Sequence, residues 1–368
     1  MNYCRQITYS YYRSPKADFD VMLDDVLNQL PSDSLILRLI CWCAPSDNEE
    51  YEQWLGLYRR RVREYFTDCV PGCSLVAQPP LECGMVLEVH SYRPSGSDVV
   101  YFKKFEKRPY VIVDNPAARI LFASGFHGSG LLETAAMQAE EAFRQLGGLL
   151  QSEGFTPSQI VRQWNYIERI TDQDGEDQRY QSFNNARADY YATDTWPNGY
   201  PAATGIGASL GGICIDLDAV ILKNEACHII PIDNRLQVAA HAYSSDVIRS
   251  SGHKKDSPKF ERAKALELGD SKLIYISGTA AIRGEESLEG VGLKKQLEVT
   301  LDNIDQLTQG QPVQHLRVYL KNPSDYDEAA HLLNELRPTV SKSFFWADVC
   351  REALLIEIEC IAGECGER

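Results

Sequence analysis

The sequence lacks the features that mark several large classes of protein. Its 368 residues carry 37 Lys and Arg against 52 Asp and Glu, a net charge of −15, so the basic excess that a nucleic-acid surface needs is absent. No apolar run approaches the roughly 18 residues of a membrane span, because Arg38 interrupts the longest one, residues 35–43. The first sixteen residues contain no apolar core of a signal peptide. We therefore expect a cytoplasmic protein that binds neither nucleic acid nor a membrane.

Cofactor and metal motifs are also missing. The eleven cysteines are scattered, and no two have the C-x-x-C spacing. Their odd number, without a secretory signal, is typical of thiols in a reducing compartment. Cys227 and His228 are adjacent, but no nearby residues complete a tetrahedral zinc site. The Walker loop, the H-E-x-x-H pattern and the Rossmann glycine pattern are absent too, which argues against zinc hydrolysis and nucleotide chemistry.

The chain does contain a repeat, the first feature to look for at this length. Residues 119–125 and 272–278 both have the pattern of a buried strand ending in Ser-Gly, and each precedes a segment with the apolar spacing of an outer helix. A strand, a second helix and a strand pair then follow in both. The final strands, residues 213–219 and 355–361, alternate acidic and apolar side chains. These matches predict one β-α-β-α-β-β unit used twice.

The first hundred residues resemble a reduced version of this unit. A strand over 35–43 precedes a helix with Tyr51, Trp54 and Tyr58 on one face, and two short strands follow. We therefore predict an α+β protein of three related units, with sheets inside and helices outside. The predicted boundaries are residues 1–100, 101–225 and 226–368.

One generic motif is best explained by backbone geometry. Residues 207–211 match the nucleophile-elbow pattern G-x-S-x-G. The elbow requires a helix after the serine, whereas a strand follows here. We therefore place Ser209 in a hairpin turn, where Gly and Ser are favoured.

Polar residues concentrate on two elements of the middle unit. The strand over 160–167 places Arg162, Trp164 and Tyr166 on one face, and a guanidinium is well shaped to bind carboxylates. On the helix that follows, Tyr180, Asn184 and Arg187 are spaced for one face. An exposed helix with an extended arginine is an equally good interpretation.

Two further segments each allow a structural and a functional interpretation. Residues 201–207 are small and glycine-rich, which fits either a tight strand edge or close approach of backbone N–H groups to an anion or ring. Glu357 and Glu359 share a strand face, which is usually the solvated side of a sheet. The alternative is that one of them lies in a cleft between units with a raised pKa, as a general acid.

The ordered motifs RQWNYI, RYQSFNNAR, PAATGIG, SGTAAI and ADVCREALLIEIE resemble the chorismatase family, over about residues 30–363 and most closely from residue 115 onward. The repeated unit resembles the YjgF/RidA family, which has a chorismate-mutase-like fold and forms trimers. The resemblance implies a pseudo-trimer in one chain, a substrate cleft between the second and third units, and no metal or organic cofactor. An internal trimer also removes the need for partner subunits, so we expect a monomer.

The resemblance further implies cleavage of chorismate with loss of pyruvate. Glu357 stands at the position of the family's general acid, which protonates the enolpyruvyl group. Arg162, Arg187, Tyr166 and Tyr180 are the candidate carboxylate binders. The full set of candidate substrate-binding residues is Arg162, Asn165, Tyr166, Tyr180, Arg187, Thr204, Gly205, Gly207, Ala280, Ala281 and Arg351.

The expected product depends on Cys350, seven residues before Glu357. Branches of the family that form 3-hydroxybenzoate, alone or with 4-hydroxybenzoate, resemble this chain in that cysteine, and Ala280-Ala281 favours the same branch. As an alternative, Cys350 is only a small buried residue and the product is a trans-dihydroxycyclohexadiene carboxylate.

Two rival functions differ in class. A RidA-like imine hydrolase usually has an arginine in the closing hairpin, where this chain has Pro201-Ala-Ala-Thr204 without one. A non-catalytic binding protein predicts no turnover and tolerance of Glu357→Gln.

Overall fold

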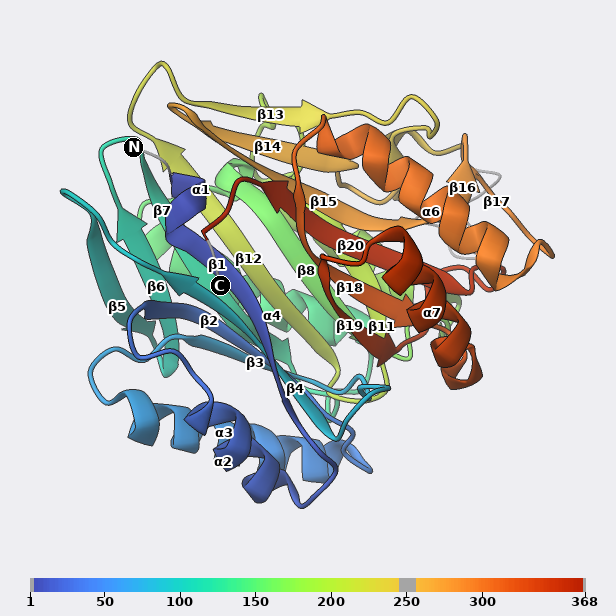
Figure 1. Ribbon diagram of the computed structural model, residues 1–368, viewed down its shortest axis with the longest axis horizontal. Coiled ribbons are helices and arrows are strands. Elements are labelled where there is room, and N and C mark those ends of the chain that lie inside the picture. Colours follow the sequence, from blue (N-terminus) through green and yellow to red (C-terminus); the bar gives the residue numbers. More distant parts are fainter. Residues whose placement is uncertain (1–2, 245–255, 367–368) are drawn as a thin grey trace.

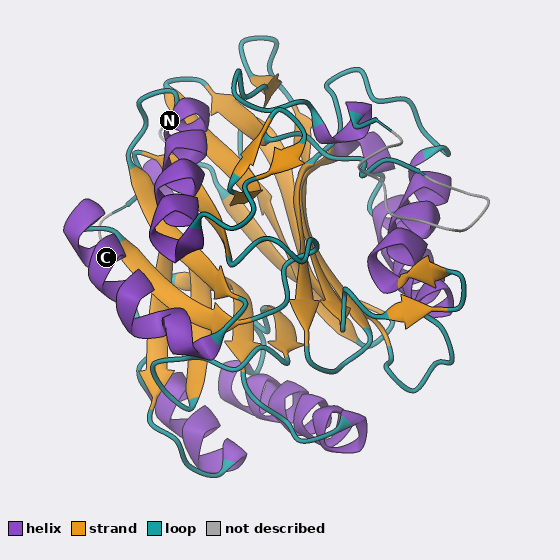
Figure 2. Ribbon diagram, turned by 90° about the vertical axis from the view of Figure 1, so that its right-hand side faces the viewer, coloured by secondary structure: helices purple, strands orange, loops and turns teal. Residues whose placement is uncertain are grey.

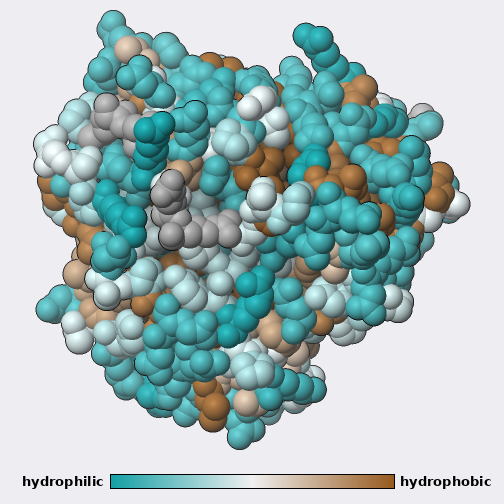
Figure 3. Space-filling view, viewed as in Figure 1, coloured by the Kyte–Doolittle hydropathy of each residue, from teal (hydrophilic) through white to brown (hydrophobic). Residues whose placement is uncertain are grey.

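The computed structural model describes residues 3–244 and 256–366. These residues form three large sheets, one per predicted unit, that lie in the interior with the long helices on the outside (Figures 1 and 2). No helix in the described ranges is long and apolar enough to cross a membrane. Hydrophilic side chains cover most of the face in Figure 3, and apolar ones gather there only in small patches.

The first unit has a four-stranded sheet of order β1-β4-β2-β3. A short helix, α1, precedes it. Its elements are α1 (Tyr3–Gln6), β1 (Ile7–Ser14), α2 (Phe19–Asn28), β2 (Leu35–Trp42), α3 (Asn48–Phe66), β3 (Gly72–Val76) and β4 (Met85–Tyr92).

The middle unit has a six-stranded sheet of order β11-β8-β12-β7-β6-β5 and a small β9-β10 hairpin. Its elements are β5 (Val99–Phe105), β6 (Arg108–Asp114), β7 (Ala118–Gly128), α4 (Ala135–Ser152), the 3-10 helix η1 (Pro157–Gln159), β8 (Ile160–Glu168), β9 (Gln173–Asp174), β10 (Asp177–Gln178), α5 (Arg179–Tyr191), β11 (Ala202–Ala208) and β12 (Ile213–Leu222).

The third unit has a six-stranded sheet of order β13-β14-β15-β20-β18-β19. Its elements are β13 (His228–Ile232), the 3-10 helix η2 (Ala240–Ala242), β14 (Ala263–Leu268), β15 (Ser271–Ala280), β16 (Ile282–Arg283), β17 (Glu286–Ser287), α6 (Gly292–Thr308), β18 (Val313–Leu320), the 3-10 helix η3 (Pro323–Asp325), α7 (Tyr326–Leu336), β19 (Ser341–Trp346) and β20 (Ile356–Gly363).

The predicted repeat is confirmed and extends to the whole chain. In each unit the last strand of the repeat (β4, β12 or β20) lies between the first (β1, β7 or β15) and the second (β2, β8 or β18), and the second strand of the repeat pairs in parallel with the third. The first unit is reduced, as expected, because its sheet has four strands where the others have six. It nevertheless contains the complete repeat, since β1 and α2 supply the strand and helix that the sequence pattern did not indicate. The division at residues 100 and 225 stays a prediction.

The helices cover the sheets with apolar faces. In α4 the side chain of Thr134 accepts a hydrogen bond from the backbone N–H of Met137, which caps the first turn. Apolar residues three and four apart then face the sheet, including Ala139, Phe143 and Leu146. Each fully buried Leu or Phe contributes about 1.5–3 kcal/mol. By contrast, α5 buries polar residues as well as apolar ones, and some of its residues line the site described below.

Buried ion pairs join the three units in a cycle. In each pair, the arginine of a unit's second strand reaches a carboxylate on the last strand of the next unit, and all six side chains are buried. The pairs are Arg38 with Asp218, Arg162 with Glu359 and Arg317 with Glu88.

The arginines of these pairs meet at one aromatic ring. The guanidinium carbons of Arg38, Arg162 and Arg317 lie 4.8, 4.7 and 5.1 Å from the centroid of the Trp164 ring, which is favourable for a cation. Trp164 therefore marks the centre of the pseudo-trimer. The first and last described segments of the chain also meet, because the N–H of Gly366 donates a hydrogen bond to the carbonyl of Cys4 at 3.1 Å.

Candidate active site

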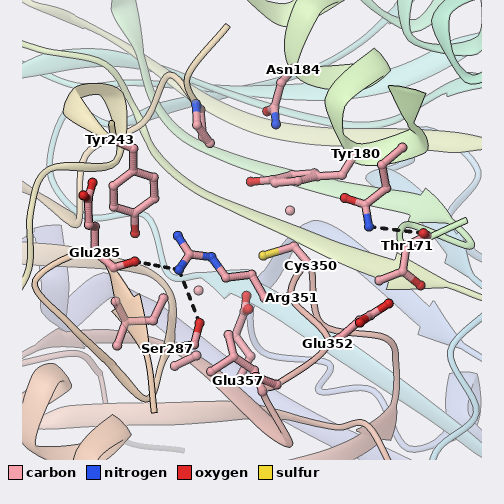
Figure 4. A pocket seen from close by; sticks show the side chains of 18 of the residues that line it. Thr171, Tyr180, Asn184, Tyr243, Glu285, Ser287, Cys350, Arg351, Glu352 and Glu357 are labelled. Carbon is pink, nitrogen blue, oxygen red and sulfur yellow. Dashed lines mark hydrogen bonds between the residues drawn. The ribbon is translucent and has the colours of Figure 1, made fainter. Parts of the chain in front are cut away.

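A cavity of about 410 Å³ lies between the middle and third units (Figure 4). The middle unit contributes residues of the β9-β10 hairpin, α5 and β11. The third unit contributes residues from the segment before β14, from β15, from the β16-β17 hairpin, and from the segment that leads into β20. The predicted site residues that line this cavity are Tyr180, Gly205, Ala280, Cys350, Arg351 and Glu357.

Glu357 on β20 is the central carboxyl group of the cavity. Its side chain is 5% exposed, and no described residue forms a hydrogen bond or ion pair with its carboxyl group. Gly278 opposite makes room for it, since a Cβ there would lie 2.1 Å from Oε1 of Glu357. Burial, together with the charge of Glu359, raises the pKa of Glu357 to about 8, although Arg262 and Arg162 act against this. Glu357 therefore carries a proton at neutral pH.

Glu359 lies behind Glu357 in a different environment. Its carboxylate accepts hydrogen bonds from Arg317 at 2.7 Å, from Tyr319 at 2.8 Å and from Thr204, and it pairs with Arg162. Burial alone would raise the pKa of Glu359, but the two arginines and the two hydroxyl donors hold it below its usual range. Two carboxyl groups on one strand face thus have opposite protonation states.

The structure does not bring Arg162, Tyr166 and Asn165 to the cavity. Nη2 of Arg162 pairs with Glu359 and also donates to the hydroxyl of Thr204 at 2.7 Å. Tyr166 accepts a hydrogen bond from Arg317 at 3.2 Å in the core between units. Asn165 faces the other way and donates to the carbonyl of Thr204 at 2.9 Å. The strand alternation was predicted correctly, but the shared face of Arg162 and Tyr166 meets the third unit instead of solvent or ligand.

Among the described residues, the cationic groups that line the cavity are Arg262 and Arg351, of which Arg262 was not predicted. Tyr243 lies between them, with its ring centroid 5.4 Å from the guanidinium carbon of Arg262 and 5.0 Å from that of Arg351. Nη1 of Arg351 donates to the carbonyl of Glu285 at 2.7 Å (Figure 4). Nη2 of Arg262 donates to the carbonyl of Val238 at 2.8 Å. In the sequence, Arg262 is distinguished only by being a charged residue just before an apolar strand.

The glycine-rich stretch 201–207 serves close packing. A Cβ on Gly205 would lie 2.9 Å from Cε2 of Tyr180, and one on Gly207 would lie 2.7 Å from the carbonyl oxygen of Asp348. Gly205 thus admits the Tyr180 ring to the cavity wall. Gly207 supports the segment that carries Cys350. Thr204 does not line the cavity, but its hydroxyl accepts a hydrogen bond from the N–H of Gly278 at 2.9 Å.

The remaining predicted residues divide between the cavity and the layer behind it. Cys350 points into the cavity (Figure 4), and burial, with a contribution from Glu357, raises the pKa of its thiol to about 12, so the thiol is neutral. Ala280 lines the cavity, whereas Ala281 packs in the core. Arg187 does not line the cavity but donates to Asn184, which does.

Metal-ligand groupings are absent from the part of the chain that the structure describes, where no three His, Cys, Asp or Glu side chains could hold a metal ion together.

Comparison with known proteins first defines the fold class. The crystal structure of a chorismatase superimposes with a TM-score of 0.68 and 21% identity, covering 97% of this chain and 98% of that one. The two chains therefore share their α+β fold over almost their whole length.

The sequence comparisons then show which proteins the chain is similar to. The model of the chorismatase FkbO/Hyg5-like N-terminal family matches residues 118–219. A 3-hydroxybenzoate synthase of Streptomyces hygroscopicus is 28% identical over 228 residues, which cover 56% of this chain and 64% of that protein. A chorismatase of the same organism is 31% identical over 220 residues, or 54% and 60% of the two chains. Each match spans less than two thirds of the relative's length. These matches confirm that the chain is similar to the chorismatase family, as its motifs indicated.

Proposed function

We propose that this protein cleaves chorismate to pyruvate and 3-hydroxybenzoate, with Glu357 as the general acid. The observation that carries this proposal is the buried, unpartnered carboxyl group of Glu357, which faces the cavity and has a pKa of about 8. A carboxyl group in this state can donate a proton at neutral pH and withdraw it again.

The chemistry follows from the substrate. Protonation of the methylene carbon of the enolpyruvyl group produces an oxocarbenium-like centre at the adjacent carbon. Water attack on this centre gives a hemiketal, and cleavage of its bond between the side-chain carbon and the ether oxygen releases pyruvate and leaves the ring diol. Attack by the neighbouring ring hydroxyl gives a cyclic ketal instead. Cleavage of the bond between that hydroxyl oxygen and the ring, with loss of the adjacent ring proton, then makes the ring aromatic, and the remaining hemiketal collapses to pyruvate and 3-hydroxybenzoate. Chorismate has the atoms of pyruvic acid plus hydroxybenzoic acid, so the aromatic route consumes no water overall. Formation of a diene diol consumes one water molecule instead.

Arg262 and Arg351 are the proposed partners of the two carboxylates of chorismate. Both line the cavity, and both lie on the wall that carries Glu357. They replace Arg162 and Arg187 in the role that the sequence motifs implied. Tyr180, which lies on the opposite wall (Figure 4), adds a hydroxyl donor.

The choice of 3-hydroxybenzoate, alone or with 4-hydroxybenzoate, is supported by three observations. Cys350 and Ala280 both line the cavity, as the resemblance to the aromatising branches requires. The curated relatives include a protein named 3-hydroxybenzoate synthase. The neutral thiol of Cys350 lies close enough to Glu357 for the charge of that carboxyl group to add to the effect of burial in raising the pKa of the thiol.

The test uses purified protein and chorismate without added cofactor. Pyruvate is followed by a coupled assay, and aromatic acids are followed by chromatography. We expect pyruvate and 3-hydroxybenzoate in equal amounts, and a rate that falls as the pH rises through about 8. A non-aromatic diene acid would retain the chorismatase activity and contradict the proposed role of Cys350. No pyruvate from folded protein would contradict the proposed function and favour a binding protein or an imine hydrolase.

We further propose that the protein is a monomer. The cycle of three buried ion pairs is complete within one chain. Light scattering that gives the mass of a single 41.4 kDa chain would agree with this, and a larger mass would contradict it.

A further inference from the structure

Asn184 is a cavity-lining residue with an unused donor. Its side chain is 1% exposed and points into the cavity from α5, above the ring of Tyr180 (Figure 4). Its Oδ1 accepts a hydrogen bond from Nη2 of Arg187 at 2.6 Å. No described residue accepts a hydrogen bond from its Nδ2 group. Because this NH₂ group belongs to a cavity-lining residue and has no acceptor among the described residues, it is suited to an acceptor that enters the cavity.

Arg187 determines which way this amide points. It lies one helical turn after Asn184, is 1% exposed, and stacks on the Phe183 ring with 5.2 Å between its guanidinium carbon and the ring centroid. A guanidinium group has only donors, so it can bond the oxygen of the amide but never its NH₂ group. The opposite amide orientation would set two donors against each other. Arg187 therefore holds the NH₂ group of Asn184 toward the cavity.

Arg187 is also a buried charge without a counterion. Among the described residues, no carboxylate forms an ion pair with it, and its Nε has no hydrogen-bond partner. Burying an unpaired charge is costly, and such a charge favours an anion nearby. Burial raises the pKa of Tyr180, and the charge of Arg187 acts against this, so the guanidinium is close enough to affect a side chain of the cavity wall.

We propose that Asn184 binds a carboxylate oxygen of chorismate through its NH₂ group, and that Arg187 is the residue that positions this amide. This inference rests on the proposed function and adds a substrate contact from the middle unit. Asn184 lies on the wall opposite Arg351 and Glu357 (Figure 4), and the two carboxylates of chorismate lie at different ends of the molecule. A carboxylate bound at Asn184 would leave the other for the arginines of the third unit.

The test is a double-mutant cycle on chorismate binding. Calorimetry is done in the Glu357→Gln background, so that the substrate is not consumed. We expect Asn184→Ala to weaken binding about tenfold, the usual cost of losing a hydrogen bond to a charged acceptor. Asn184→Asp should weaken it more, because it sets a negative acceptor against an anion. Arg187→Met should weaken binding about as much as Asn184→Ala, and the double variant no more than either alone.

Additional variants separate positioning from general structural support. Arg187→Lys keeps a cation and a donor, so it should retain most of the affinity. Arg187→Leu takes the place of Arg187→Met in the double-mutant cycle if the latter does not fold. Arg144→Met on the exposed face of α4 and Asn322→Ala in an exposed turn are matched controls that should bind normally. Melting temperatures of all variants are measured alongside.

Losses that add in the double variant would contradict the positioning role of Arg187. Unchanged binding by Asn184→Ala would contradict the substrate contact while leaving the proposed function intact. No chorismate binding by the Glu357→Gln protein, together with no pyruvate from the wild type, would contradict the proposed function and this inference with it.

Discussion

The interface that holds Glu357 and the interface that holds Asp216 are built from the same strands of neighbouring units. Both carboxyl groups occupy the same position on the last strand of their unit, opposite the second strand. Asp216 accepts hydrogen bonds from the Ser74 hydroxyl at 2.5 Å and the Gly125 N–H at 2.8 Å. Glu357 has neither, because the N–H of Gly278 donates to Thr204 instead. One position thus supports packing in one interface and faces a cavity in the other.

In the third interface, as in the first, the carboxyl group at this position has hydrogen-bond partners. Glu88 occupies the equivalent position on β4, accepts two hydrogen bonds from Arg317 at 2.7 Å each, and bonds His90 at 2.6 Å. Burial alone would raise the pKa of Glu88, but Arg317 and His90 hold it well below its usual range. The repeat therefore supplies three carboxyl positions, and the partners of each decide whether it stabilises the protein or is free to react.

The largest expected effect is on catalysis. Glu357→Gln keeps the size of the side chain but removes its proton donor, so turnover of chorismate should fall by about 10²–10⁴. Asp216→Asn is the matched change in the first interface and should leave turnover unchanged, since Asp216 does not line the cavity. Pyruvate release by both variants is the measurement. Equal losses of turnover in the two variants would contradict the proposal that Glu357, unlike Asp216, acts as the acid.

The next effect is on stability. Arg317→Met leaves the buried carboxylates of Glu88 and Glu359 without their shared cation, and breaking a buried pair typically costs about 3–5 kcal/mol. Arg5→Met removes an exposed pair with Glu364, which typically contributes less than about 1 kcal/mol. Urea unfolding of the two variants checks this. A small effect of Arg317→Met would show that the cycle of pairs does not hold the units together.

Stability should also depend on pH through Glu357. Because the folded protein binds a proton that the unfolded chain releases above its ordinary pKa of 4.5, the contribution of this proton is complete below that pH. This contribution is lost as the pH rises to about 8. A pKa shift of this size corresponds to a change in stability on the order of a few kcal/mol. The stability of Glu357→Gln relative to the wild type should therefore increase between pH 5 and pH 8. The exposed change Glu140→Gln should show no such trend, and a flat difference for Glu357→Gln would place its pKa near the ordinary value.

The smallest effect concerns Arg262. Its charge lowers the pKa of Glu357, so Arg262→Met should move the alkaline limb of the rate profile to higher pH. Loss of a carboxylate partner should also raise KM about tenfold. Arg283→Met, on the exposed pair with Asp302, serves as the control. An unchanged pH profile and an unchanged KM would contradict the proposed role of Arg262 as a carboxylate partner.

The repeat could be predicted because its elements have strong local patterns. The Ser-Gly strands and the outer helices of the middle and third units follow apolar periodicity directly. In contrast, β1 mixes tyrosines, serines and an arginine, and its burial does not alternate regularly. Its place in the sheet depends on pairing with β4, about eighty residues later. Such a long-range contact leaves no trace in a short window of sequence.

The site could be predicted only where residues follow known motifs. Glu357, Cys350, Arg351 and Tyr180 meet at the cavity as expected. The surroundings of Arg162 could not be predicted, because strand alternation indicates which face of the strand it lies on but not which sheet covers that face. Arg262 and Tyr243 come from a part of the third unit without a motif, and only the packing of units brings them to the cavity.

The protonation state of Glu357 is the central claim, and infrared difference spectroscopy tests it most directly. Spectra of the wild type minus Glu357→Gln, recorded from pH 4 to pH 10, isolate the absorption of this carboxyl group. The structure predicts a protonated carboxyl band at pH 7 that disappears with a midpoint near pH 8. A band already lost by pH 5 would show an ordinary ionised glutamate and contradict its role as the acid.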